Sequence, residues 1–259
     1  MKLGHSVRKD REMAFHNRTF STGTREQAAK YYSNFTSSRV FFMHELRHRV
    51  PDQAILEFGC GTGSLAVELA GKGAQMTGID LSEVAIEQAR NKAERADVTD
   101  RSTFHVMDAE DLTFPEESFD MVCGAGILHH LDVERVLGEI YRVLKREGVA
   151  IFLEPLGHNP FINLYRKFTP SLRTVDEHPL RQKDLKFIET RFASSEFYYF
   201  HLFSLLAIPL RGLPGFEYLV KKLDRIDRFV FARLPWLRKE AWIVVMILSK
   251  SREALPLKD

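Results

Sequence analysis

Three closely spaced glycines, Gly59, Gly61 and Gly63, form the part of the sequence best suited to holding a ligand. They follow the apolar run Ala54–Phe58 and directly precede a helical pattern. Glycine tolerates positive φ and lets a ligand approach the backbone closely, and the first turn of a helix offers free N–H groups. A strand, a glycine loop and a helix in this order predict a nucleotide-type site at the carboxyl end of a parallel sheet.

The spacing of the glycines narrows the choice of nucleotide. Gly61, Gly63 and Ala66 fit the dinucleotide pattern G-x-G-x-x-G/A, which is weak when it stands alone. The Lys-Ser/Thr pair of a P-loop is missing, which argues against bound ATP phosphates. A tight turn that holds no ligand is the structural alternative.

Short β-rich segments alternate with helical patterns through the middle of the chain, which predicts a parallel sheet with crossover helices. The predicted strands are residues 54–58, 75–79, 103–107, 119–123, 149–153 and 241–248. The predicted helices are residues 62–70, 82–95 and 133–144, the second with Ser82 as its N-cap. Residues 194–207 are aromatic and strand-like, and residues 216–233 alternate apolar and basic positions at helical spacing.

The motifs around these strands resemble those of class I S-adenosylmethionine-dependent methyltransferases of the broad small-molecule type. The matching segments, in order, are residues 57–63 (E-x-G-C-G-T-G), 78–82, 106–110, 119–122 with 127–131, and 140–148 with Glu154-Pro155. The resemblance covers residues 54–155 and weakens before residue 50 and after residue 160. Glu57 stands where the family's first motif often has Asp.

The resemblance implies roles for residues at the strand ends. Gly59, Gly61 and Gly63 would hold the methionine part of S-adenosylmethionine, with Glu57 orienting the loop and the ligand's ammonium group. Asp80 would bind the ribose hydroxyls, since a carboxylate accepts from two O–H donors. Asp108 would receive the adenine amino group, with Ala109 beside the ring. The expected cofactor set also includes Cys60, Leu81, Gly124 and Tyr32, an aromatic residue of an N-terminal lid.

Two of these acids have simpler explanations. Asp80 could only cap the helix that begins near Ser82, and Asp108 could be an acid on a solvated surface.

Methyl transfer is an in-line displacement on an activated sulfonium carbon, so the protein mainly positions the acceptor. A general base helps if the acceptor is a hydroxyl or a protonated amine. His129, just after the fourth strand, and His178, in the polar loop after the fifth, are the predicted catalytic residues. His129 could instead pack or cap the next helix, and His178 could belong to a solvated turn.

A second motif points to different chemistry. His44-Glu45-Leu46-Arg47-His48 matches the zinc-binding pattern H-E-x-x-H. Its place before the first strand, with no third ligand at a known spacing, favours a solvated helix face, so no metal is expected. Cys60 and Cys123 are too few for a disulfide framework or a structural zinc site and are expected to be small core or loop residues.

The C-terminal third carries an amphipathic stretch, residues 216–239, with Lys and Arg on its polar side. It could rest on a membrane surface or a lipid substrate, or cover the pocket or a subunit interface. An ordinary helix inserted before the last strand is favoured.

Composition excludes several classes of protein. The chain has 259 residues with 37 Lys+Arg against 35 Asp+Glu, and this balance gives no sign of a nucleic-acid binder. Hydrophobic residues make up 44%, too many for a disordered chain. No apolar run reaches the ~18 residues of a transmembrane helix, and the polar start is not a secretory signal, so a cytoplasmic location is expected.

We therefore expect an α/β fold with a Rossmann-like, doubly wound seven-stranded sheet whose last strand is antiparallel. Residues 1–50 would form a helical lid and residues 51–155 the cofactor-binding core. Residues 156–259 would supply substrate-recognition elements, a helical insertion and the last two strands. The expected activity is methyl transfer from S-adenosylmethionine to a small, apolar or lipid-like acceptor, with O-methylation favoured over C- or N-methylation.

The alternatives are an NAD(P)-dependent oxidoreductase on the same type of sheet and a non-catalytic S-adenosylmethionine-binding scaffold. Peripheral membrane contact and homo-oligomer formation stay open.

Overall fold

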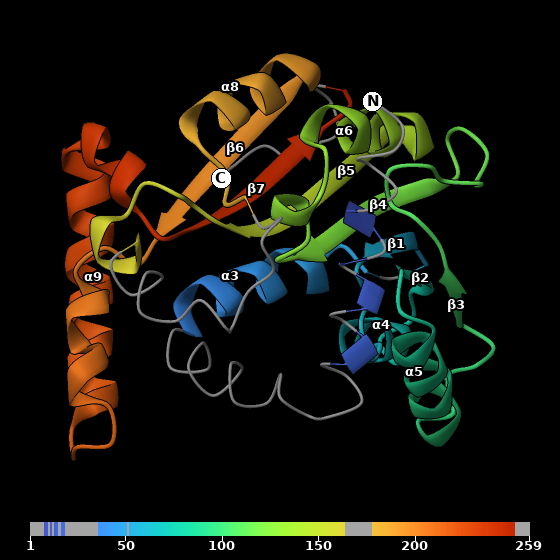
Figure 1. Ribbon diagram of the computed structural model, residues 1–259, viewed down its shortest axis with the longest axis horizontal. Coiled ribbons are helices and arrows are strands. Elements are labelled where there is room, and N and C mark those ends of the chain that lie inside the picture. The colour runs from blue at the N-terminus through green and yellow to red at the C-terminus, as the bar shows by residue number, and fades with distance from the viewer. Residues whose placement is uncertain are drawn as a thin grey trace.

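The computed structural model describes residues 36–50, 52–163 and 178–251, together with residues 8, 9, 11, 13, 14, 17 and 18. Seven strands form one sheet in the order β3-β2-β1-β4-β5-β7-β6 (Figure 1). The strands are β1 (Ala54–Phe58), β2 (Gln75–Asp80), β3 (Ser102–Val106), β4 (Phe119–Ala125), β5 (Leu144–Pro155), β6 (Ser194–Phe200) and β7 (Ile243–Ser249). The expected α/β fold with a doubly wound sheet is confirmed.

The last strand runs against its neighbours, as predicted. β1 is parallel to β2 and β4, whereas β7 is antiparallel to both β5 and β6. Ile243 at the start of β7 pairs with Pro155 and Phe200, so β5 and β6 both end at the edge where β7 begins. All seven residues of β7 are buried, because helices cover both faces of the sheet.

Helices cover both faces of the sheet (Figure 1), and an apolar core lies between the helices and the sheet on each face. On one face lie α3 (Thr36–Arg47), α4 (Ser64–Ala70) and α5 (Glu83–Arg95); on the other lie α6 (Val133–Val143) and α8 (Gln182–Arg191). Ile55 packs in the core under α3, α4 and α5, and Leu56 packs in the core under α6 and α8, because successive side chains of a strand point to opposite faces.

The helices begin where the sequence provides capping groups. The Ser82 hydroxyl accepts a hydrogen bond from the Ala85 N–H at 3.1 Å, so the predicted N-cap of α5 is confirmed. Asp132 caps α6 in the same way by accepting from Glu134 and Arg135. The buried stripe of α6 then covers the sheet with Val136, Leu137, Ile140 and Val143, each contributing about 1.5–3 kcal/mol of burial.

Several predicted boundaries differ from the structure; β5, for example, begins at Leu144 and not at residue 149. The first core helix starts at Ser64, not at residue 62, because Gly63 has a left-handed φ of 71°. β6 ends at Phe200, although residues 194–207 are strand-like in sequence. His201 takes a φ of 63°, and the backbone N–H groups of residues 202–204 turn to the buried Asp227 carboxylate instead of continuing the ladder.

A helical insertion separates β6 from β7. It consists of η3 (Ser204–Leu210), α9 (Phe216–Arg233) and η4 (Pro235–Glu240). α9 stands beside the sheet at the edge where β5 and β6 end (Figure 1). Across the described part of the chain, every helix is too short or too polar to cross a bilayer.

A side chain at Gly63 would disturb both the packing of the core and the backbone conformation. A Cβ there would lie 2.8 Å from the Ala89 Cβ, and the φ of +71° disfavours any other residue. We expect Gly63→Ala to lower the free energy of unfolding by about 2–4 kcal/mol, as measured by urea denaturation. Gly138→Ala is the matched control, since a Cβ on this exposed α6 position meets nothing within 4 Å. That variant gains about 0.5–1 kcal/mol, and equal effects at the two sites would contradict the packing argument.

Candidate active site

A pocket opens at the carboxyl ends of β1 to β4, where the strand order reverses between β1 and β4. Ligands of open α/β sheets bind at such a switch point. Of the predicted cofactor residues, the pocket is lined by Gly59, Asp80, Leu81, Asp108 and Ala109. The structure therefore brings together residues from three separate strand ends.

The glycine loop runs directly along this pocket. Gly59 has a φ of 61°, and a Cβ on it would lie 2.8 Å from Ile127 Cδ1 across the pocket wall. The Cys60 N–H donates to the Ile79 carbonyl at 2.9 Å, which fastens the loop to β2. The loop thus has a fixed shape and leaves backbone, not side chains, facing the pocket.

Asp80 connects this loop to the next helix. Its Oδ2 accepts from the Gly61 N–H and its Oδ1 from the Ser82 N–H, both at 2.9 Å. The cap of α5 is the Ser82 hydroxyl and not Asp80, so the helix-cap explanation of Asp80 is wrong. Each carboxylate oxygen has a further lone pair for a ligand donor.

Glu57 is buried below the loop at the end of β1. Burial raises its pKa to about 8, and nearby Asp80 adds to the rise, while a hydrogen bond from the Ala66 backbone and the charge of Lys92 oppose it. Its Oε2 has no hydrogen-bond partner among the described residues. A buried carboxylate oxygen without a partner fits a cationic ligand group such as an ammonium.

Asp108 and Glu110 meet two cations from the amino-terminal segment. Lys9 forms an ion pair with Asp108, and Arg8 forms one with Glu110. Both basic residues line the pocket. Sequence reasoning missed them, because a basic pair near the terminus has no pattern that links it to acids about a hundred positions away. Tyr32, expected in the lid, lies outside the described residues.

His129 lies behind the pocket wall, in η1 (Leu128–His130). Its Nδ1 is 2.8 Å from Glu154 Oε2, and Glu154 is fully buried. Glu154 Oε1 accepts from the N–H groups of Ile127 and Leu128, both at 2.8 Å, so the carboxylate holds the whole turn. A carboxylate on one ring nitrogen sets the tautomer and orientation of the imidazole.

The other histidines lie on either side of His129. His130 lines the pocket, and its ring centroid is 4.1 Å from that of His129. The His178 N–H donates to the His129 carbonyl at 2.8 Å, while the His178 side chain is exposed. The structure thus brings His129 and His178 together through the backbone.

Three further predicted residues are buried around the pocket. Gly124 lies in β4, one residue before the lining residue Ala125. Cys60 and Cys123 are free thiols, and burial raises the pKa of each above its ordinary value. A thiol that stays protonated is a poor nucleophile, which fits the core or loop role expected from the sequence.

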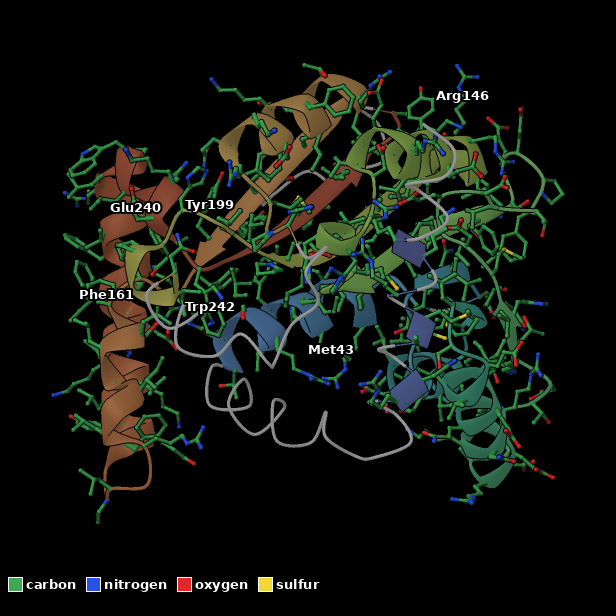
Figure 2. All side chains as sticks on the ribbon, viewed as in Figure 1. Met43, Arg146, Phe161, Tyr199, Glu240 and Trp242 are labelled. Atoms are coloured by element: carbon green, nitrogen blue, oxygen red, sulfur yellow. The ribbon has the colours of Figure 1, made fainter. Side chains whose placement is uncertain are left out.

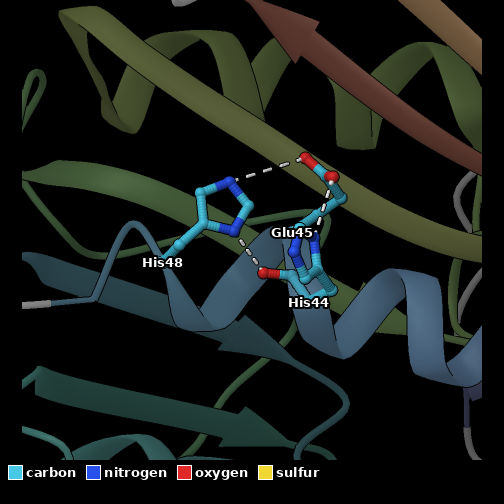
Figure 3. Close-up of side chains that lie close together, drawn as sticks. All are labelled: His44, Glu45 and His48. Atoms are coloured by element: carbon cyan, nitrogen blue, oxygen red, sulfur yellow. Dashed lines mark hydrogen bonds and ion pairs between the residues drawn. The ribbon is translucent and has the colours of Figure 1, made fainter.

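The side chains of His44, Glu45 and His48 converge at the carboxyl end of α3, with His48 just after its last residue (Figure 3). Their ligand atoms lie within 4.8 Å of one another. However, Arg49 Nη1 is 2.8 Å from both Glu45 Oε2 and His48 Nε2, and this cation occupies the space between them. The side chains of His44 and His48 are 72% and 45% exposed. These contacts support the expected solvated helix face.

Comparisons with known proteins identify the family to which the chain belongs. A family model described as a methyltransferase domain matches residues 56–152. The chain is 31% identical over 158 residues to a 2-phytyl-1,4-naphtoquinone methyltransferase from Synechococcus elongatus, covering 56% of this chain and 67% of that protein. It is 40% identical over 96 residues to 27-O-demethylrifamycin SV methyltransferase from Amycolatopsis mediterranei, covering 36% and 35% of the two chains.

A solved structure shows the same fold at low sequence identity. Magnesium protoporphyrin IX methyltransferase from Synechocystis superposes with a TM-score of 0.58 and 14% identity, covering 92% of this chain and 99% of that one. This protein belongs to the class I S-adenosylmethionine-dependent methyltransferases, whose cofactor is S-adenosylmethionine. The chain matches between about a third and a half of the length of the first curated relatives, at 35%, 52% and 48%.

The raised pKa of Glu57 has a consequence for stability. The folded state binds this proton more tightly than the unfolded state, whose carboxyl has the ordinary value of 4.5. The resulting stabilisation is complete below that value and is lost as the pH rises through about 8. We expect Glu57→Gln, which cannot ionise, to gain on the order of a few kcal/mol relative to wild type between about pH 5 and 8.5.

Urea denaturation at several pH values measures this difference. Glu87→Gln, at an exposed position of α5, is the control and keeps the wild-type pH dependence. A constant difference between Glu57→Gln and wild type across this pH range would contradict the assignment.

Proposed function

We propose that this protein transfers the methyl group of S-adenosylmethionine to a small, apolar acceptor. The observation that carries the proposal is that one sheet edge combines the glycine loop, Asp80, and a buried Glu57 with an unsatisfied oxygen. Family membership supports the same cofactor.

The cofactor fits the groups along this edge. Gly59, Gly61 and Gly63 hold the methionine part, and the unpartnered oxygen of Glu57 receives its ammonium group, either directly or by orienting the loop. Asp80 accepts the ribose hydroxyls with its remaining lone pairs. Cys60, Leu81 and Gly124 shape the surrounding walls.

The adenine end requires a rearrangement at Asp108. Its carboxylate pairs with Lys9, so Lys9 must share or release it when the adenine amino group binds beside Ala109. The segment that carries Arg8 and Lys9 then serves as a lid, together with Tyr32.

When bound, the cofactor supplies a methyl group on a sulfonium sulfur that is already activated for displacement. The chain's own task is to position the acceptor, exclude water and remove a proton where the acceptor carries one. Ala125, Ile127 and Leu131 give the pocket an apolar wall, which favours an apolar acceptor.

If the acceptor group is a hydroxyl, a histidine can act as the general base that removes its proton. Glu154 orients the His129 imidazole, and His130 faces the pocket directly. We assign the role of general base to His129. His130 is its neighbour at the pocket, and the backbone N–H of His178 stabilises the turn by donating to the His129 carbonyl. O-methylation is therefore favoured over C- and N-methylation. It also agrees with the name of the Amycolatopsis relative, whereas other relatives carry the names of C-methyltransferases.

Binding of the product cofactor tests the core of the proposal. At a concentration of about one hundred times its Kd, S-adenosylhomocysteine adds about 2.7 kcal/mol of stability, a rise in Tm of roughly 5–10 °C for a chain of this size. NAD causes no rise. Asp80→Ala abolishes the rise, while Asp100→Ala, an acid with a 76% exposed side chain, keeps it. Stabilisation by NAD and not by S-adenosylhomocysteine would overturn the proposal.

Turnover tests the role of His129. With a naphthoquinol or another apolar phenol as acceptor, S-adenosylhomocysteine formation separates an enzyme from a scaffold that only binds the cofactor. We expect His129→Gln to lower kcat by about 10²-fold or more and to recover activity as the pH rises and the acceptor ionises by itself. His105→Gln, on the exposed side of β3, is the control. An unchanged kcat in His129→Gln would leave that histidine a purely structural role.

A further inference from the structure

The solvent-facing side of α9 carries a continuous stripe of aromatic and basic residues. Its members are spaced at helical intervals and all are exposed: Tyr218, Lys222, Arg225, Phe229 and Arg233. We refer to these five residues as the α9 outer face. Tyr218 is 64% and Phe229 is 61% exposed. The stripe contains three cations and no acid, although the chain as a whole is nearly neutral.

The opposite side of α9 fixes how the helix is turned. Val220, Asp227 and Phe231 are buried. The Asp227 carboxylate accepts three backbone hydrogen bonds, from Leu202 at 2.9 Å, Phe203 at 2.7 Å and Ser204 at 3.2 Å. Because the buried Asp227 carboxylate must keep these three donors, the rotation of α9 about its own axis is fixed. The outer face therefore points to the solvent.

Cations of the outer face lie over its aromatic rings. The Lys222 Nζ is 4.6 Å from the Tyr218 ring centroid, and the Arg233 guanidinium is 5.2 Å from that of Phe229. Each pair presents an apolar ring and a charge side by side. This combination suits the boundary between lipid phosphates and acyl chains, where rings insert and cations pair with phosphate.

Exposed apolar side chains are concentrated in the segment that contains α9. Of the fourteen large hydrophobic residues that are exposed in the described part of the chain, nine lie between residues 203 and 236. They include Leu213 at 58%, Ile226 at 47% and Trp236 at 64% exposed. Single exposed hydrophobics are ordinary, but such a concentration marks an interaction surface.

We propose that the α9 outer face, with Trp236, docks this protein on the surface of an anionic lipid bilayer. The cations match the negative surface potential of such a membrane, and the rings and Trp236 supply interfacial anchors. A nucleic acid would use the cations and could stack on Trp236, but it would leave the aliphatic Leu213 and Ile226 without a role.

Docking would also place the pocket near the lipid. In sequence, α9 follows β6 and precedes β7, and in space it stands beside the sheet at the edge where β5 and β6 end (Figure 1). The pocket lies at the carboxyl ends of β1 to β4, which is the same edge of the sheet because β4 and β5 are parallel. An apolar acceptor dissolved in the bilayer would thus face this side of the protein. This last step rests on the proposed function, whereas docking itself needs neither cofactor nor acceptor.

The two tryptophans allow a direct test. Trp236 is exposed, and Trp242 is only 2% exposed. We expect the full chain to co-sediment with phosphatidylcholine vesicles containing about 30% phosphatidylserine and not with phosphatidylcholine alone. Trp emission should shift to shorter wavelength on binding, and Trp236→Phe should remove the shift. Raising the salt from about 0.05 to 0.5 M weakens binding.

Paired charge reversals locate the surface. Lys222→Glu with Arg233→Glu should lower vesicle affinity about tenfold or more. Arg95→Glu with Arg146→Glu makes the same change in net charge at exposed positions on other elements, and Arg146 lies far from α9 (Figure 2). This control pair should bind vesicles like wild type. Unchanged Tm values show that both pairs keep the fold.

Four outcomes would overturn the proposal. They are no binding to phosphatidylserine vesicles, equal loss in the two variant pairs, a dimer in light scattering that the α9 pair abolishes, and tight binding of a single-stranded oligonucleotide without a Trp shift on vesicles. None of them affects thermal stabilisation by S-adenosylhomocysteine, so the failure of docking and the failure of the proposed function are distinguishable.

Discussion

The reversal of strand order between β1 and β4 is the constraint on which the rest of the site depends. β1 lies between β2 and β4, so the connections that leave these strands diverge and open a crevice at their carboxyl ends. The glycine loop turns inside this crevice, where Gly59 has no room for a Cβ against Ile127. Because the crevice is narrow, the residues at the ends of β1 to β4 can all contact one bound molecule.

The acids around this crevice are satisfied in different ways, and this decides what each can do. Asp80 and Glu154 each accept two backbone N–H groups, so they act as rigid braces that orient the loop and the turn before His129. Glu57 is buried away from water, and its Oε2 has no hydrogen-bond partner among the described residues. The burial raises the pKa of this carboxyl group. A cationic ligand group would supply the missing interaction, which links cofactor binding to the charge state of a buried residue.

The insertion between β6 and β7 is held to the sheet by the same physical means. The Asp227 carboxylate gathers three N–H groups that would otherwise be left without partners after β6 ends, and it thereby fixes the rotation of α9. The aromatic and basic side of the helix is consequently presented to the surroundings at the edge where the pocket opens. A single buried acid thus joins the end of a strand to the orientation of a surface.

The sequence by itself determined the features of this protein that depend on residues close together along the chain. Strands and helices could be predicted because burial repeats with their own periods. The glycine loop with Gly59 and Gly63 could be predicted because a strand, a loop and a helix are contiguous there, and Asp80 could be placed at the end of the second strand. Only the tertiary structure decided that Lys9 pairs with Asp108 and Arg8 with Glu110, 99 and 102 positions away. It also decided that His130 faces the pocket while Glu154 holds His129, and which side of α9 is outward. Contacts between distant segments leave no periodic trace in a sequence, because they depend on where folding places each side chain and on which buried polar groups then need partners.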